Sequence, residues 1–275
     1  MTEVSESTEQ LSGRKEQPHE HLVEERDGAV AVLRIDREHA LGALSRGMVE
    51  ALVAYLDGLA HDDSVRVLVV TGTGRGFIAG ADIREYDGVS QAAFDDYQRL
   101  GRAAFGRLAS LPQPTIAAVN GYAFGGGFEV ALACDLILAS TAARFALPEV
   151  KLGLLPGGGG TQRLARAIGV RATKELVMTG RSMRPDEAER RGLVARVVEP
   201  DELMPAAREL ARTLAARAPR AVREAKRLID DGVEASLETG WTLEQGVLSS
   251  LYATADAREG IRAFIEKRDP AFTGD

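Results

Sequence analysis

Short apolar runs alternate with segments of helical spacing along the chain, and this alternation restricts the fold more than any other feature. Apolar residues fill the predicted strands, which span residues 22–23, 29–35, 65–71, 115–119 and 136–139. Apolar residues recur every three or four positions in the predicted helices, which span residues 48–59, 94–108 and 129–133. Strands separated by helices predict an α/β architecture.

The last third of the chain is predicted to be mostly helical. Residues 171–192, 201–233 and 235–268 have helical spacing, and the second of these segments divides into two amphipathic helices near Pro219. Little in this part has the pattern of a strand. We therefore expect an appended helical region here rather than an extension of the sheet.

The first residues differ from the rest of the chain in being polar and without periodicity, which predicts a disordered tail. The chain is thus predicted to have three parts, namely a disordered polar tail at 1–18, an α/β core with the active site at 19–200 and a helical region at 201–275.

Composition limits the class of protein. Hydrophobic residues make up 45% and charged residues 27% of the chain, which is ordinary for a water-soluble globular protein. The longest apolar stretches, such as residues 116–119 and 130–134, are far too short to span a bilayer. The N-terminus has no apolar segment typical of a signal peptide. We therefore expect a cytoplasmic protein without a membrane partner.

Cysteine and histidine usage disfavours several kinds of site. The chain has one cysteine, Cys134, and four histidines, none of them beyond residue 61. A single cysteine excludes an intrachain disulfide and a cysteine metal cluster. The sequence also contains no His-Glu-x-x-His motif and no P-loop. The nearest match to a serine nucleophile elbow, residues 43–47, lacks the first glycine. We therefore predict no metal site, and we regard a serine hydrolase as a weak alternative.

Two glutamates twenty residues apart lie in apolar, glycine-rich surroundings. Glu129 ends the run Gly-Tyr-Ala-Phe-Gly-Gly-Gly-Phe-Glu, and Glu149 precedes the glycine-rich run at residues 155–163. An unpaired charge is costly in such surroundings. Two carboxylates beside backbone that can approach a ligand closely predict general acid/base chemistry on a bound small molecule.

Three consecutive glycines, residues 125–127, lead into the predicted helix that contains Glu129. The N–H groups at a helix start have no partner within the helix, and they lie at the positive end of the helix dipole. Glycine also lets a ligand come close to the backbone. The run therefore predicts hydrogen-bond donors for a developing negative charge, with close helix–strand packing as the alternative interpretation.

Four segments share the order and spacing of the enoyl-CoA hydratase/isomerase family, the crotonases, and the chain resembles that family from about residue 20 to its end. The four segments are residues 77–83, 118–129, 145–163 and 260–268. The resemblance implies a crotonase-like spiral of repeated ββα units, followed by a C-terminal α-helical region that trimerises. Two such trimers often stack into a hexamer.

The resemblance also implies an activity, the syn addition of water to a 2-enoyl-CoA through an oxyanion-stabilised thioester enolate. The N–H groups of Ala81 and Gly126 would form the oxyanion hole. Glu129 would act as the base on water, and Glu149 would protonate C2. Gly157 would orient that water. No cofactor is expected, because coenzyme A enters as part of the substrate.

The family's coenzyme A and substrate contacts map onto His39, Leu41, Ala81, Asp82, Ile83, Arg84, Gly126, Phe264 and Lys267. Of these, Phe264 and Lys267 match residues that reach the nucleotide of a neighbouring subunit, and Asp82 is also a candidate cap for the turn that follows it. Gly42 replaces the family's asparagine, which is expected to loosen the turn beside Leu41. The expected walls of the acyl pocket are Tyr86, Tyr97, Phe124 and Phe128.

Three alternatives to a hydratase stay open on the same scaffold. A carnitinyl-CoA-type dehydratase also keeps both glutamates, and a 3,2-enoyl-CoA isomerase commonly keeps only the second, here Glu149. An RNA-binding homologue is disfavoured, because a formal net charge of −7 and an isoelectric point near 5.3 oppose attraction to phosphates. We therefore expect an acyl-CoA thioester as ligand and no nucleic acid.

Overall fold

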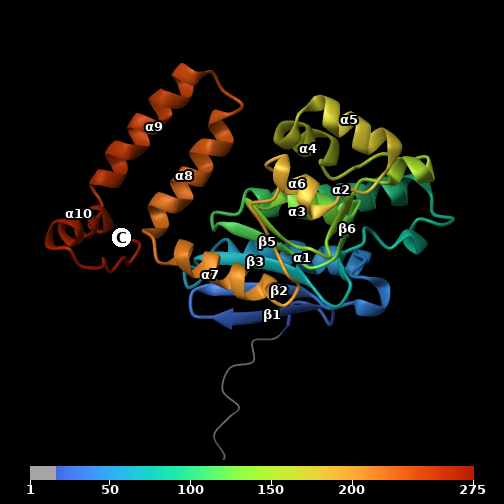
Figure 1. The fold of residues 1–275 in the computed structure, drawn as a ribbon, viewed down its shortest axis with the longest axis horizontal. Coiled ribbons are helices and arrows are strands. Elements are labelled where there is room, and N and C mark those ends of the chain that lie inside the picture. The colour runs from blue at the N-terminus through green and yellow to red at the C-terminus, as the bar shows by residue number, and fades with distance from the viewer. Residues whose placement is uncertain (1–16) are drawn as a thin grey trace, which may run out of the picture.

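A six-stranded sheet forms the centre of the fold in the computed structural model, which describes residues 17–275 (Figure 1). Its strands are β1 (Leu22–Asp27), β2 (Val30–Ile35), β3 (Val67–Gly72), β5 (Thr115–Val119), β7 (Leu136–Ser140) and β9 (Arg196–Val198). Their order across the sheet is β1-β2-β3-β5-β7-β9. β1 and β2 form an antiparallel hairpin, and all other neighbours are parallel.

The five predicted strands are confirmed. The sequence pattern does not predict β9, because its three residues are too few to show a period. The predicted tail, residues 1–18, lies outside the described residues apart from its last two.

A second, smaller sheet lies beside the first and consists of β4 (Gly76–Ile78), β6 (Tyr122–Phe124) and β8 (Arg144–Ala146). These strands are parallel and only three residues long, so the sequence pattern does not predict them. Each follows a strand of the large sheet and precedes a helix, which gives the units β3–β4–α2, β5–β6–α3 and β7–β8–α4. The predicted spiral of ββα units is therefore confirmed.

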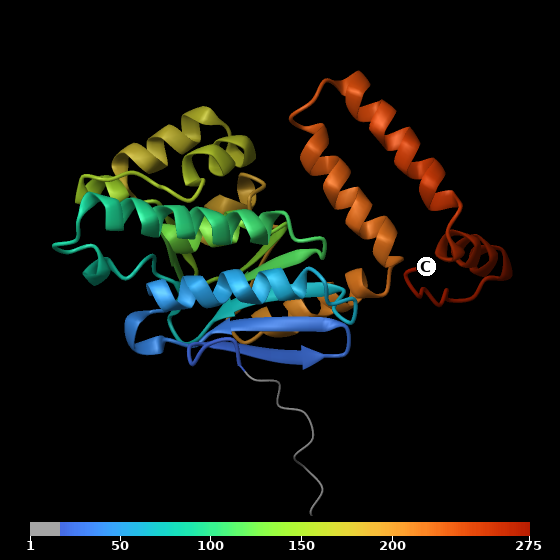
Figure 2. The same cartoon turned by 180° about the vertical axis from the view of Figure 1, so that it is seen from behind.

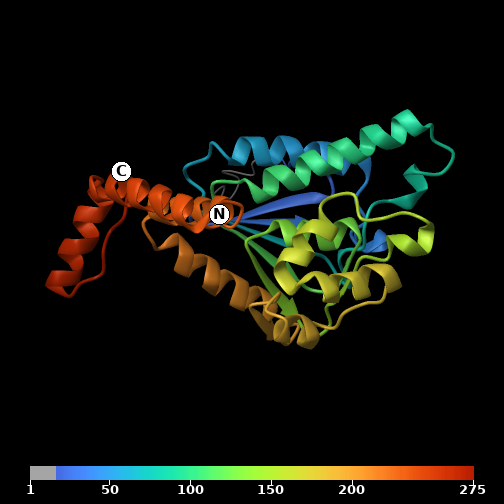
Figure 3. The same ribbon diagram turned by 90° about the horizontal axis from the view of Figure 1, so that it is seen from above.

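Helices cover both faces of the large sheet. Neighbouring residues of a strand point to opposite faces, and here both sets of side chains are apolar and buried. Leu68 and Val70 belong to the core under α1 (Arg46–Leu59) and α2 (Gln91–Ala109). Val67 and Val69 belong to the core under α7 (Leu203–Ala215). From above, α1 and α2 lie on one side of the sheet and α7 on the other (Figure 3).

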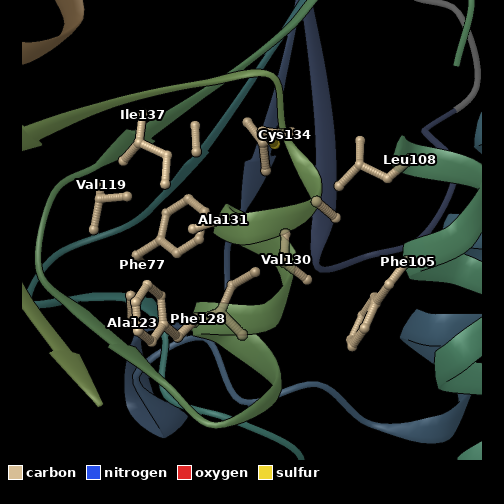
Figure 4. Packing of buried hydrophobic residues seen from close by; sticks show 14 of the residues in the cluster. Phe77, Phe105, Leu108, Val119, Ala123, Phe128, Val130, Ala131, Cys134 and Ile137 are labelled. Atoms are coloured by element: carbon tan, nitrogen blue, oxygen red, sulfur yellow. The ribbon is translucent and has the colours of Figure 1, made fainter. Parts of the chain in front are cut away.

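Shorter helices surround the small sheet and complete the part of the fold that forms the site. The α-helices are α3 (Gly126–Ala133), α4 (Gly160–Ile168), α5 (Val170–Thr179) and α6 (Pro185–Arg190). Three 3-10 helices also occur, η1 (Glu38–Ala40), η2 (Ile83–Glu85) and η3 (Glu149–Leu152). α3 is buried almost throughout, with aromatic and aliphatic side chains packed around it (Figure 4). The start of α3 therefore has a fixed position in the core.

The last three helices, α8 (Pro219–Gly232), α9 (Leu237–Tyr252) and α10 (Ala255–Glu266), project away from the sheets (Figures 1 and 2). The predicted division of residues 201–233 near Pro219 is confirmed, since α8 begins there. α7, although it lies within the predicted helical region, packs on the large sheet. Lys226 of α8 forms an ion pair with Asp135 of the core, with 2.9 Å between its ammonium and the carboxylate. Among the described residues, no helix is long and apolar enough to cross a membrane.

Candidate active site

A cavity of about 410 Å³ opens where the three strands of the small sheet end. The segment after β4 contributes Gly80 and Ala81, and the end of β6 leads to Gly126. The segment after β8 contributes Glu149. The parallel strands end on the same side of the sheet, so their terminal residues surround one space. The spiral thereby brings together residues that are up to about seventy positions apart.

Glu129 lies in the first turn of α3 and is 3% exposed. Its Oε1 accepts hydrogen bonds from the N–H groups of Gly158 at 2.7 Å and Gly160 at 2.8 Å. Burial raises the pKa of Glu129 above its usual range, while these two N–H groups and the charge of Arg163 oppose the rise. The two donors hold the carboxylate in one orientation at the cavity wall.

Glu149 begins η3, directly after Pro148, and lines the same cavity. Its Oε2 is buried and has no hydrogen-bond partner among the described residues. Burial raises the pKa of Glu149 to about 7. A hydrogen bond from the backbone N–H of Glu149 itself opposes this rise, and the negative charge of Glu129 adds to it. The cavity therefore contains one carboxylate, Glu129, that two N–H donors hold, and one, Glu149, whose buried oxygen has no donor among the described residues. These different surroundings favour the ionised form of the first and the protonated form of the second.

We expect the Glu149→Gln variant to be more stable than the wild type at pH 8 and about equally stable at pH 4. A carboxyl group whose pKa is raised on folding stabilises the protein at low pH, and that contribution is lost as pH rises from 4.5 through about 7. Glutamine stays neutral throughout, so the difference should grow to at most about 3.5 kcal/mol, at roughly 1.4 kcal/mol for each pKa unit. Urea unfolding at several pH values measures it, and a difference independent of pH would contradict the assignment.

Ala81 and Gly126 lie close together, since a methyl group added to Gly126 would be 3.9 Å from the Ala81 nitrogen. Gly126 is the first residue of α3, and no described residue accepts a hydrogen bond from either N–H group. Gly125, which precedes the helix, has a φ of +51°, and a methyl group there would come within 3.1 Å of Glu149 Oε1. Glycine at 125 therefore allows the backbone turn that leads into Gly126 beside Glu149.

The loop between η3 and α4 forms a further wall of the cavity. Gly157, predicted to orient the water, lies on this wall, and its role stays a prediction. The sequence pattern does not single out Gly158 and Gly160 as partners of Glu129. A methyl group at Gly158 would lie 2.4 Å from Phe105 and 2.7 Å from Glu129 Oε2, so only glycine fits there without a shift.

Three of the four predicted acyl-pocket aromatics, Tyr86, Tyr97 and Phe124, line the cavity. The prediction for Phe128 is wrong. Phe128 is 1% exposed and packs against Phe145, 5.2 Å between ring centroids, in the core around α3 (Figure 4). A helix turns side chains three residues apart to one face, but Phe128 directly precedes Glu129 and points elsewhere. Phe94 and Phe105 of α2, which the sequence pattern does not predict as wall residues, line the cavity instead.

Asp82, Ile83 and Arg84 follow the oxyanion segment, and only Ile83 of the three lines the cavity. The carboxylate of Asp82 accepts from the guanidinium of Arg84 at 2.6 and 2.8 Å and from that of Arg37 at 3.0 Å. The Arg84 hydrogen bond, and then that of Arg37, hold the pKa of Asp82 well below its usual range. The predicted capping role of Asp82 is confirmed, because it accepts from the Arg84 N–H at the start of η2.

His39 and Leu41 lie outside the cavity lining, at η1, and their contact with a nucleotide stays a prediction. The expectation that Gly42 loosens this turn is wrong. Gly42 has a φ of +75°, and a methyl group there would lie 2.7 Å from the carbonyl oxygen of Phe77. Glycine therefore allows a tight approach of two backbone segments at this point.

Phe264 lies on α10, and Lys267 caps that helix in a left-handed conformation. Neither residue lines the cavity of its own chain, and Phe264 is 86% exposed. Contact with the nucleotide of a neighbouring subunit stays a prediction for both residues.

The spiral of ββα units and the cavity with two carboxylates and two backbone donors define an α/β protein of the crotonase class. Residues 25–275 match the family described as enoyl-CoA hydratase/isomerase. The chain belongs to this family.

Similar proteins and solved structures agree with this family assignment. The chain is 42% identical over 255 residues to the protein named probable enoyl-CoA hydratase echA8 of Mycobacterium bovis, covering 93% of this chain and 98% of that protein. It is 41% identical over 249 residues to the short-chain-enoyl-CoA hydratase of Clostridium acetobutylicum, covering 90% and 95%. It is also similar to a crystal structure of enoyl-CoA hydratase from Bacillus anthracis, with a TM-score of 0.91, 38% identity, and coverage of 93% of this chain and 100% of that chain.

Proposed function

We propose that this chain is an enoyl-CoA hydratase, which adds water across the C2=C3 bond of a 2-enoyl-CoA thioester to give a 3-hydroxyacyl-CoA. The observation that carries the proposal is that Glu129 and Glu149 face one cavity beside two backbone N–H groups that have no acceptor in the described part of the chain. The names of the relatives, among them a short-chain-enoyl-CoA hydratase, support the same activity. The substrate class is an acyl-CoA thioester.

The proposed mechanism begins with the thioester oxygen between the N–H groups of Ala81 and Gly126. These donors stabilise the negative charge that develops when the thioester becomes an enolate, and such a donor typically contributes about 3–4 kcal/mol to the transition state. They belong to the backbone at the end of a strand and the start of a helix, so they need no rearrangement during the reaction.

Glu129, in its ionised form, takes a proton from water while the water oxygen bonds to C3. Glu149, in its protonated form, gives its proton to C2, and the thioester carbonyl is restored. The raised pKa of Glu149, about 7, leaves a large protonated fraction near neutral pH, and the hydrogen bonds of Glu129 favour its ionised form. Coupled carboxylates share protons, so the pair titrates as a unit.

We expect turnover of trans-2-enoyl-CoA by protein that has been treated with a chelator and given no nicotinamide or flavin. The two carboxylates and two backbone donors supply every proton transfer and the charge stabilisation, and coenzyme A enters as part of the substrate. The falling absorbance of the conjugated thioester reports the reaction. Activity that disappears with the chelator and returns with a metal ion would contradict this mechanism.

The same assay separates the alternatives. A 3,2-enoyl-CoA isomerase needs only a proton shuttle between C2 and C4, so turnover of a 3-enoyl-CoA without hydration of any 2-enoyl-CoA would favour it. A carnitinyl-CoA-type dehydratase shares both carboxylates with the hydratase, so a carnitinyl-CoA thioester belongs in the substrate panel.

The proposal includes a homotrimer, or a hexamer of two trimers, as the functional assembly. Support comes from α8 and α9, in which no residue is buried, and from the apolar side chains exposed along α8–α10, namely Ile229, Leu237, Trp241, Leu243, Leu248, Tyr252, Ile261, Phe264 and Ile265. An exposed apolar surface of this kind marks an interaction site. A cytoplasmic location stays a prediction.

A further inference from the structure

Arg102 is the one positively charged side chain among the described residues that line the active-site cavity. It lies on α2, one turn before Phe105, and it has no ion pair or hydrogen bond with any described residue. The two arginines nearest to it on α2 differ in this respect, because Arg99 pairs with Asp96 and Arg107 with Asp57. Arg102 is therefore an exposed cation at the border of the cavity, without a partner among the described residues.

A second hollow, of about 590 Å³, adjoins the cavity and shares Arg102, Gly157 and Gly158 with it. Arg163 and Arg166 of α4 also line this hollow. Arg166 is neutralised by Glu234 at 2.8 Å, whereas Arg163 has no acidic partner within 4.0 Å among the described residues. The hollow thus contains two guanidinium groups that have no carboxylate partner in residues 17–275, in a protein whose net charge is −7.

The position of the hollow relative to the reacting atoms fits the far end of an acyl chain. Gly158 borders the hollow, and its N–H also donates to Glu129 at 2.7 Å. Phe105 contacts the site of an added methyl group at both Gly126 and Gly158, so it lies between the oxyanion donors and the hollow. A chain whose thioester oxygen is bound by those donors and whose C3 faces Glu129 can extend past Gly158 towards Arg102.

We propose that the preferred acyl group of this enzyme ends in a carboxylate, which Arg102 binds at the entrance of the hollow with the positive charge of Arg163 behind it. The substrate would be a short 2-enoyl monothioester of a dicarboxylic acid. This inference rests on the proposed hydratase function and names its substrate class. A guanidinium can hold a carboxylate through two parallel hydrogen bonds, whereas a methyl end leaves it without an anion.

The test compares trans-2-hexenoyl-CoA with the monothioester of trans-2-hexenedioic acid, whose double bond is at C2 from the thioester. The two probes have six acyl carbons and differ only in the terminal group. We expect the wild type to favour the carboxylated probe in kcat/KM by at least about tenfold, the lower limit for a charge-assisted hydrogen bond. We expect Arg102→Gln to lower this preference at least about tenfold, mainly by raising KM for the carboxylated probe, because the contact is remote from C2 and C3.

Arg99→Gln is the matched control, since Arg99 is an exposed arginine of the same helix that does not line the cavity. It should leave the preference at the wild-type value. Arg102→Lys should keep part of it, because the charge stays but the two parallel hydrogen bonds are lost.

Three results would overturn the inference. Hydration of both probes with equal kcat/KM by the wild type would show that the chain end is not recognised, and the hydratase function would stand. An equal loss on both probes in Arg102→Gln would show that Arg102 has only a general structural role. Failure of the wild type to hydrate either probe would overturn the proposed function, and this inference with it.

Discussion

Replacing either Glu129 or Glu149 by glutamine is expected to lower kcat for trans-2-enoyl-CoA at least about 100-fold, the usual scale for a positioned acid or base. Glutamine at 129 cannot take the proton from water, although it keeps an oxygen for the N–H groups of Gly158 and Gly160. Glutamine at 149 cannot give a proton to C2. Substrate binding should change much less, since the oxyanion donors belong to the backbone. Steady-state kinetics with each variant measure both quantities.

The double variant should lose little more than the worse single variant, because both carboxylates act on the addition of one water and their effects do not add. Circular dichroism and light scattering serve as controls for folding and assembly. Near-full hydratase activity in one single variant would contradict the two-carboxylate mechanism. Loss of activity only in Glu149→Gln would favour the isomerase instead.

The second large effect concerns stability, and we expect Gly127→Ala to destabilise the fold by more than about 3 kcal/mol, beyond the usual range for overpacking. An added methyl group would lie 1.8 Å from the carbonyl oxygen of Ile78. That oxygen belongs to the backbone of β4, so it cannot turn aside as a flexible side chain would. Either α3 or β4 must move, although both belong to the buried core. Urea unfolding, or the yield of soluble protein, measures the effect.

Gly126→Ala is the matched control for stability. A methyl group at 126 would lie 3.7 Å from Phe105, an ordinary contact distance, and alanine favours a helix more than glycine does. Its free energy of unfolding should therefore stay near the wild-type value. Equal destabilisation by the two substitutions would contradict the close approach of α3 to β4.

In the large sheet, β2, β3, β5 and β7 could be predicted because each is a mostly apolar run, and the start of β1 because Leu22 and Val23 are apolar. β4, β6 and β8 could not, because three residues show no period, although these strands position the catalytic groups. Their pairing depends on the spiral, which repeats at each turn of the chain. That repetition lies in the arrangement of elements and not in the residues.

Glu129 and the glycine run could be recognised locally, since a buried acid and free N–H groups occur within a few residues of each other. The partners of Glu129 could not, because Gly158 and Gly160 are about thirty positions away and meet it only in the folded chain. The error at Phe128 has a related cause. α3 is buried on nearly all sides, so its sequence has no polar face to show which side chains point to the cavity.

The small sheet delivers two different kinds of group to the cavity, and this difference affects how the protein can evolve. The oxyanion donors are main-chain N–H groups at Ala81 and Gly126, so most point mutations leave them in place. Each acid is a single side chain, Glu129 or Glu149, which one nucleotide change can replace. Descendants of such a chain can therefore lose or exchange a reaction step while they inherit the capacity to polarise a thioester, and new activities can arise on the scaffold by changes at very few codons.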